Sequence, residues 1–230
     1  MSRSRNDDMR RKILEAALRL FLEKGYDNVQ KKEIALEVGI TPSLLQHYFS
    51  LKEELLIDII YTIVYWTSEY ARTLKVPESE QDDLSFYVHI GVFYHLFYAN
   101  LCHCEYKLLK LYTAVLFNAP LLQNGLSISD ERLHTQWAQT LEEKDFRHYT
   151  LNYVLNGTLS QLIASYFRNS VLLIPYSTIV NSALSAAFRY VGLTEELEGS
   201  IFKQVDRLLT PQQLSNFFQY SNSHLEDFIL

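Results

Sequence analysis

The residues with the most specific chemistry lie close together near the N-terminus. The segment TPSLLQHY, from Thr41 to Tyr48, combines hydroxyl, amide and imidazole groups in barely two helical turns. As a helix, it would turn outward the side chains of Pro42, Ser43, Leu44, Gln46 and His47. Side chains at the start of a short helix can reach base edges in the major groove of DNA, which is about 12 Å wide. We therefore expect this segment to read bases, with a second helix bracing it across the backbone.

The sequence supplies the elements that must position this segment. One face of residues 30–38 is apolar, and Gly39 ends the helix that this pattern predicts. Thr41 then forms an N-cap and Pro42 a first helical residue, which completes a helix-turn-helix. An amphipathic helix over 7–24 precedes the pair. The predicted core between these helices comprises Ile34, Ala35, Val38, Ile40, Leu45 and Phe49.

Beyond this head, the chain continues to show helical patterns. Ser50 and Glu53 form a capping box at the start of a long helix that ends near Lys75. Further helices are expected over 82–101, 104–118, 128–144, 147–170, 175–191, 195–208 and 211–228. Only 7 Gly and 5 Pro serve 230 residues, and no alternating strand pattern is present. We therefore predict an all-α fold, with a helix-turn-helix head (residues 1–52) on a larger helical body (residues 53–230).

The charge of the chain is divided unevenly between these two parts. The whole chain carries −6, but residues 1–52 hold 10 Lys and Arg against 7 Asp and Glu, a net charge of +3. A basic head on an acidic body favours contact with phosphates at one end of the molecule. The N-terminus lacks the apolar run of a secretory signal, and no run is long enough to cross a bilayer. We expect a cytoplasmic protein with no membrane partner.

Several short motifs in the head agree in order and spacing with one known family. They are Gly25-Tyr26, Ile34-Ala35, Gly39-Ile40-Thr41, Tyr48-Phe49 and Lys52-Glu53-Glu54-Leu55. Over residues 9–56 the chain resembles the TetR family of bacterial transcriptional regulators. The resemblance implies a homodimer that binds double-stranded operator DNA. It also implies a repressor that a small hydrophobic or aromatic effector releases from the operator.

The resemblance further assigns roles to individual head residues. It implies that Tyr48 and Lys52 contact phosphates, with the positive end of the following helix assisting Lys52. The sequence departs from the family pattern at Ser43, at Gln46 and at Val29-Gln30, which leaves the operator sequence open. A glutamine can pair bidentately with adenine, so Gln46 is a candidate base reader. The expected DNA contacts are Gln30, Thr41, Pro42, Ser43, Leu44, Gln46, His47, Tyr48 and Lys52.

In the body, the resemblance implies a dimer interface on the helices over 147–170 and 175–191. The expected interface residues are Leu155, Leu159, Leu162, Tyr166, Ile179, Ala183, Ala187 and Tyr190. Aromatic residues with a few polar neighbours also recur at helical spacing, which suits a pocket for a flat or hydrophobic ligand. The expected pocket residues are Trp66, Tyr70, His89, Phe93, Phe97, Tyr112, Trp137 and Asn156. Either set can instead pack inside one protomer, because an apolar stripe on a helix does not show which surface it packs against.

Two other functions remain open from the sequence. One is a metal- or haem-sensing regulator, because His95, Cys102, His103 and Cys104 are ligand types, although no pair has the spacing that one helical site needs. We therefore assign no metal ligand and no cofactor. The other is a ligand-binding module whose head lacks specific DNA affinity. The sequence contains no Gly-x-Ser-x-Gly elbow, phosphate-binding loop or His-Glu-x-x-His motif, so we expect no catalytic residues and no enzyme.

Overall fold

The computed structural model describes residues 2–76, 82–103, 108, 111, 112, 114, 151, 155, 159, 162 and 175–229. Every regular element in these ranges is a helix, so the all-α prediction is confirmed. The predicted helices over 104–118 and 147–170 are helical at each of their described positions, and the one over 128–144 lies outside the described residues. None of the helices in the described ranges combines the length and apolar character that a bilayer crossing requires.

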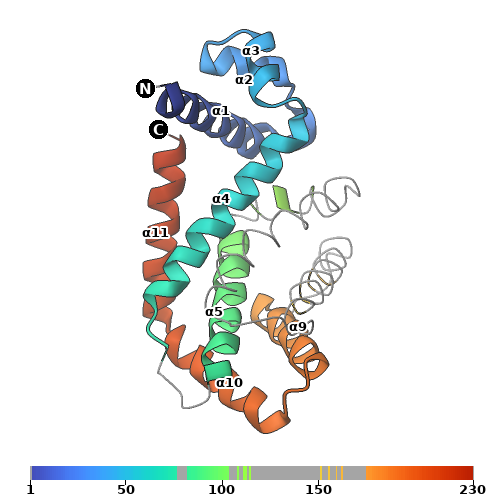
Figure 1. Ribbon diagram of the computed structural model, residues 1–230, viewed down its shortest axis with the longest axis vertical. Helices are drawn as coiled ribbons and strands as arrows, with labels where there is room; N and C mark the ends of the chain where they lie inside the picture. Colours follow the sequence, from blue (N-terminus) through green and yellow to red (C-terminus); the bar gives the residue numbers. More distant parts are fainter. Residues whose placement is uncertain are drawn as a thin grey trace.

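A small head lies at one end of the elongated molecule (Figure 1). Its elements are α1 (Ser2–Lys24), the 3-10 helix η1 (Tyr26–Asn28), α2 (Lys31–Val38) and α3 (Pro42–Tyr48). Gly25 separates α1 from η1 with φ 84°, and Gly39 ends α2 with φ 74°. Both angles lie in the left-handed region that favours glycine. The bounds of α2 and α3 agree with those predicted to within one residue, whereas α1 begins earlier than residue 7.

The head has a small apolar core that sets the angle between its helices. Ile13, Ala17 and Phe21 recur at helical spacing on α1 and are at most 1% exposed. Each large apolar side chain that is removed from water contributes about 1.5–3 kcal/mol. Of the core residues predicted from the sequence, Ile34, Ala35, Leu45 and Phe49 are buried, while Val38 and Ile40 are half-buried. The helical patterns therefore identified the core of the head correctly.

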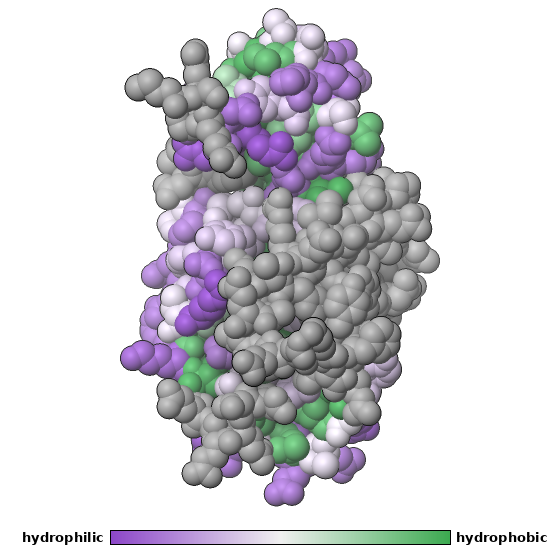
Figure 2. Space-filling view, in the orientation of Figure 1, coloured by the Kyte–Doolittle hydropathy of each residue, from purple (hydrophilic) through white to green (hydrophobic). Residues whose placement is uncertain are grey.

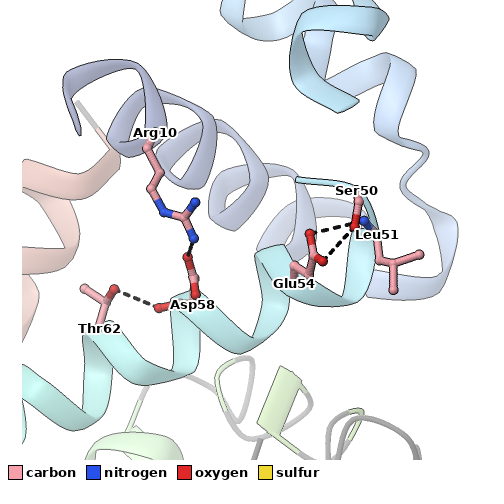
Figure 3. Close-up of polar contacts among 6 residues, drawn as sticks. All are labelled: Arg10, Ser50, Leu51, Glu54, Asp58 and Thr62. Atoms are coloured by element: carbon pink, nitrogen blue, oxygen red, sulfur yellow. Dashed lines mark hydrogen bonds and ion pairs between the residues drawn. The ribbon is translucent and has the colours of Figure 1, made fainter. Parts of the chain in front are cut away.

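The long helix α4 (Lys52–Thr73) leads from the head into the body (Figure 1). The N-cap is Leu51 and its capping-box partner is Glu54. The predicted capping box of Ser50 and Glu53 is therefore wrong by one residue. The carboxylate of Glu54 accepts hydrogen bonds from the Leu51 amide (3.2 Å) and the Ser50 hydroxyl (2.7 Å) instead (Figure 3). Burial favours the neutral acid, but these hydrogen bonds lower the pKa of Glu54. The start of α4 is thus fixed by the second of two adjacent glutamates.

The body is built around α5 (Asp82–His103), whose positions 90–101 are all buried. Two later helices, α9 (Tyr176–Tyr190) and α10 (Glu195–Leu208), pack against it. At Gly91 the approach of α10 is so close that a Cβ would lie 2.7 Å from a methyl carbon of Val205. Glycine is therefore needed here for helix packing rather than for its backbone conformation.

The last helix, α11 (Pro211–Ile229), returns from the body toward the head. It contacts α5, α4 and α1, and Figure 1 shows it beside α4 with its end close to the start of α1. Phe217 of α11 is 1% exposed, and the buried Ser221 hydroxyl donates a hydrogen bond to Asn100 Oδ1 on α5 (2.9 Å). The C-terminal helix is thus part of the body core and also touches the head.

Candidate nucleic-acid interface

α3 lies at the far end of the head, where it is open to solvent on one side (Figure 1). The Thr41 side chain accepts a hydrogen bond from the Leu44 amide (3.2 Å), and Pro42 occupies the first helical turn. Leu45 is fully buried and anchors the helix to the core of the head. The exposed residues are Thr41, Pro42, Ser43, Leu44, Gln46 and His47. α3 is therefore short, capped and exposed along one side, as insertion into a major groove requires.

α2 braces α3 through the turn at Gly39. The Ile40 amide donates a hydrogen bond to the Ala35 carbonyl (2.9 Å), which closes the C-terminal end of α2. At the other end, the exposed Gln30 is the N-cap, and its amide donates to the Glu33 carboxylate (3.0 Å). Gln30 therefore lies beside a positive helix end, where a DNA phosphate would be favoured.

Ion pairs join α1 to α2. Arg19 pairs with Glu37 at 2.8 Å, and Lys24 pairs with Glu33 at 2.7 Å. The hydrogen bond from Lys24 lowers the pKa of Glu33, and the same contact raises the pKa of Lys24. These ion pairs add to the apolar packing that holds α2 against α1.

Arg10 connects α1 to α4 and to the end of α3. Its guanidinium pairs with the carboxylate of Asp58 on α4 (Figure 3). The same guanidinium carbon lies 4.4 Å from the centre of the Phe49 ring, which is fully buried directly after α3. A cation over an aromatic face is attracted to it. One side chain therefore contacts the two elements whose relative angle sets the direction of α3.

Gln46 makes hydrogen bonds inside the head. Its Nε2 donates to the Ser50 carbonyl (2.9 Å), and its Oε1 accepts from the ammonium of Lys31. To pair bidentately with adenine, the amide would have to exchange both partners for the base edge. The role of Gln46 as a base reader stays a prediction. The sequence did not single out Lys31, because its contacts depend on a residue 15 positions away.

The two residues that are expected to contact phosphate differ in the partners of their side chains. Tyr48 is half-buried, with its ring edge-on to His47 at a centroid distance of 5.8 Å. The Lys52 ammonium donates to the carbonyls of Tyr26 (2.8 Å) and Val29 (3.0 Å) and lies 4.0 Å from the centre of the Tyr26 ring. Contact of either residue with phosphate stays a prediction, and Lys52 already has partners within the head.

Hydrophilic residues cover much of the head in Figure 2, with a hydrophobic patch among them. The large apolar side chains exposed in the described head are Leu36 (81%), Leu44 (39%) and Leu51 (58%). Leu44 belongs to α3, where an apolar side chain can contact the methyl group of thymine. The candidate surface therefore offers both hydrogen-bonding and apolar groups.

The expected pocket residues belong to two groups in the contacts that the structure describes. Trp66 and Tyr70 of α4 face α11: Trp66 lies 5.2 Å from the His224 ring, and the Tyr70 hydroxyl donates to the Gln213 carbonyl (3.2 Å). Phe93 and Phe97 of α5 stack at 5.9 Å, and Tyr112 meets Phe97 edge-on at 5.4 Å. The half-buried His89 has its Nδ1 2.8 Å from the Ser85 carbonyl, whereas Trp137 and Asn156 lie outside the described residues. A ligand role for these residues stays a prediction.

The expected dimer residues also differ in their exposure. Leu155, Leu159, Ala183 and Ala187 are fully buried within one protomer. Leu162 is 38% exposed, Tyr190 is 53% exposed and Ile179 is half-buried, while Tyr166 lies outside the described residues. The buried members contribute to the core of their own chain. Their contact with a second copy stays a prediction, and the exposed members are better placed for it.

The residues behind the metal hypothesis have other contacts. His95 Nε2 lies 2.8 Å from Asn181 Oδ1, and His103 stacks on Phe218 at 3.8 Å. Burial raises the pKa of the Cys102 thiol to about 11, which disfavours the thiolate that metals bind. Cys104 lies outside the described residues. Across the part of the chain that is described, no three His, Cys, Asp or Glu side chains gather as metal ligands.

Comparison with known proteins concerns the head. Residues 13–59 match the family described as bacterial regulatory proteins, tetR family. The chain is 40% identical over 55 residues to the HTH-type transcriptional regulator BetI of Rhizobium meliloti (strain 1021), which covers 24% of this chain and 27% of that protein. It is 39% identical over 51 residues to the HTH-type transcriptional regulator PksA of Bacillus subtilis (strain 168), covering 22% and 25%. The matched stretch spans about a quarter of the length of these curated relatives.

A likeness to solved structures extends over more of the chain. SmeT, the repressor of the Stenotrophomonas maltophilia multidrug efflux pump SmeDEF, matches with a TM-score of 0.50 at 19% identity, covering 78% of this chain and 88% of that one. At this identity the likeness concerns the fold alone. The sequence match covers the second half of α1, all of α2 and α3, and the start of α4. In this N-terminal head, the chain is similar to the tetR family of bacterial regulatory proteins.

Proposed function

We propose that this chain is a transcriptional regulator that binds operator DNA through α3. The observation that carries the proposal is α3 itself, which is capped by Thr41, anchored by Leu45 and exposed on its outer side. The two curated relatives are HTH-type transcriptional regulators, and the family match over residues 13–59 includes this helix, which supports a role in transcription. Action in the cytoplasm and repression that an effector relieves are the remaining parts of the proposal.

The regulator acts as a homodimer in this proposal. One α3 offers few side chains to DNA, whereas two heads can meet successive major grooves about 34–36 Å apart. Once one head is bound, the second is held at a high effective concentration. Leu162 and Tyr190 remain exposed in one protomer, so both are available to a second copy.

A small-molecule effector controls binding by shifting the spacing of the two heads. An effector that prefers a spacing other than that of the operator grooves weakens binding by its difference in affinity for the two states. α4 begins in the head and continues into the body, so it can carry a change from one to the other. The packed rings of Phe93, Phe97 and Tyr112 favour an apolar or aromatic effector.

Selection from a pool of random-sequence DNA duplexes with the intact chain tests the proposal. We expect enrichment of an inverted repeat whose half-sites are about 10–10.5 base pairs apart, or a multiple of that. Ser43→Glu places a negative charge on the exposed side of α3 and should abolish enrichment. Gln219→Glu makes the same charge change at an exposed position of α11 and should leave enrichment intact.

The result that would overturn the proposal is a folded wild-type chain that enriches no sequence above the starting pool. Enrichment by Ser43→Glu as strong as that of the wild type would remove α3 from the interface. If the wild-type chain enriches no sequence, a ligand-binding module without DNA affinity would be the better description of the chain.

A further inference from the structure

Lys31, the first residue of α2, lies over the joint between α3 and α4. Its ammonium donates hydrogen bonds to the carbonyls of Phe49 and Ser50, each at 2.8 Å, and to the side-chain oxygen of Gln46. A lysine ammonium has three N–H donors, and these acceptors match all three. The side chain is half-buried. Lys31 is therefore directed into the head and has no donor left for a DNA phosphate.

Lys52, the first residue of α4, lies over the joint between η1 and α2. Its ammonium donates to the carbonyls of Tyr26 (2.8 Å) and Val29 (3.0 Å). The nitrogen also lies 4.0 Å from the centre of the Tyr26 ring, within range of a cation–π contact. Its partners therefore also lie within the head, around the segment that leads into α2.

The two contacts are reciprocal. The first residue of α2 closes the joint that precedes α4, and the first residue of α4 closes the segment that precedes α2. The Tyr26 carbonyl also accepts from the Val29 amide, and the Ser50 carbonyl also accepts from Gln46. The Phe49 and Val29 carbonyls lie outside the helices, and an unsatisfied carbonyl would be costly where burial excludes water. Hydrogen bonds from a charged donor are roughly twice as strong as those between neutral groups. Each lysine therefore holds a segment that is remote in sequence from its own helix.

We propose that Lys31 and Lys52 are positioning residues that hold α3 at its angle to α4, and that Lys31 does not contact the phosphate backbone. This inference rests on the proposed function for its effect on DNA, because it concerns how the same surface is held. For Lys52 this role is compatible with the phosphate contact that the family resemblance implies, because its two carbonyl partners leave one of its three N–H donors. Loss of Lys31 should make the placement of α3 in the groove less defined and leave the number of phosphate contacts unchanged.

Lys32 provides a matched control next to Lys31. It is a lysine on the same helix, is exposed, and has no hydrogen bond or ion pair among the described residues. Its removal takes away the same charge from the head without removing a contact that joins two segments. A difference between Lys31→Ala and Lys32→Ala therefore reports the contacts of Lys31 and not the net charge.

Amide hydrogen exchange on the intact chain without DNA tests the positioning role directly. Lys52→Ala should speed exchange of the buried Val29 amide, which donates to the Tyr26 carbonyl (3.3 Å), by about tenfold or more. Lys31→Ala should do the same at the Phe49 amide, which donates to the Leu45 carbonyl (2.9 Å). Lys32→Ala should change neither amide. If Lys52→Ala unfolds the head, Lys52→Gln, which keeps a neutral donor, gives the same comparison.

The proposal is overturned if Val29 does not respond to Lys52→Ala and Phe49 does not respond to Lys31→Ala. It is also overturned if Lys32→Ala speeds both amides as much as the other two variants do. Because no DNA is present, this result is independent of whether the chain is a DNA-binding regulator.

DNA binding separates positioning from phosphate contact. The probes are the duplex enriched by selection and a random-sequence duplex of equal length, titrated over a range of salt concentrations. Lys31→Ala should keep the slope of log affinity against log salt and lose at least tenfold in preference for the enriched duplex. A slope lowered by about one, with both duplexes weakened equally, would instead identify a phosphate contact and contradict the proposal.

Discussion

The head and the body are held together by different kinds of contact. In the head, charged side chains join separate elements, as Arg19 does with Glu37 and Lys31 with the Phe49 carbonyl. In the body, the contacts described are largely between rings and aliphatic groups, such as Phe93 with Phe97. A hydrogen bond requires one residue type at one distance and angle, whereas many apolar residues of similar volume can fill one space. The family match over residues 13–59, which falls on the head, is consistent with this difference.

The largest effect is expected from a charge placed in the body core. Ala187 of α9 is fully buried, so Ala187→Glu should lower the free energy of unfolding by about 3–5 kcal/mol, as an unpaired buried charge does. Ala186 is exposed on the same helix, and Ala186→Glu should change the stability by less than about 0.5 kcal/mol. Urea unfolding followed by circular dichroism measures both. A stable Ala187→Glu monomer that no longer forms dimers would show that this face of α9 meets a second copy.

A smaller effect should follow from changing the closest helix contact in the body. Gly91→Ala places a Cβ against Val205 and should cost about 1–3 kcal/mol through overpacking, less the gain in helix propensity. Val205→Ala should partly restore stability when combined with it. Unfolding of the two single variants and the double variant gives the coupling energy, expected to exceed about 0.5 kcal/mol. Strict additivity would mean that α10 can shift freely over α5.

In the head, the test of specific contacts is Gln46. As a base reader, Gln46→Ala should cost about 1–3 kcal/mol on the enriched duplex and relax the preference at one position in each half-site. Affinity for a random duplex should change little. The measurement is a repeated selection with the variant, followed by titration of the recovered duplexes. An unchanged base preference with weaker binding would assign Gln46 to its contacts with Lys31 and Ser50 alone.

The smallest effect concerns pH and the body. Burial lowers the pKa of His95, although its contact with Asn181 and the charge of Asp206 oppose the shift. An unfolded histidine binds a proton near pH 6.5, so as the pH falls below about 6.5 the unfolded state takes up more protons than the folded state. Stability should therefore decrease in that range. His95→Gln should make the loss between about pH 7.5 and 5.5 shallower, and an identical slope would show that the pKa of His95 is the same in the folded and unfolded states.

The sequence predicted the head well because its signals are local. Gly25, Gly39, Thr41 and Pro42 mark helix ends by backbone conformation and capping, which depend on a few adjacent residues. The register of the start of α4 was wrong by one residue. Glu53 and Glu54 are both carboxylates within reach of the preceding joint, and only the structure shows that Glu54 accepts the hydrogen bonds.

The rest of the candidate site depends on contacts between segments remote in sequence. The sequence did not show that Lys31 and Lys52 join segments within the head, because their acceptor carbonyls are 18 to 26 positions away. In the body, the helical spacing of Tyr70 showed that one side of α4 is apolar. It did not show that this side faces α11, because an amphipathic pattern carries no information about its partner.

The most direct test of the account is a salt titration of the intact chain with the enriched and the random duplex, followed by fluorescence anisotropy. A regulator that binds through a basic head should lose affinity for both duplexes linearly in log salt, because bound phosphates release counterions. Its preference for the enriched duplex should be about a thousandfold or more at each salt concentration. Equal affinity for the two duplexes, or an affinity that does not depend on salt, would contradict the account.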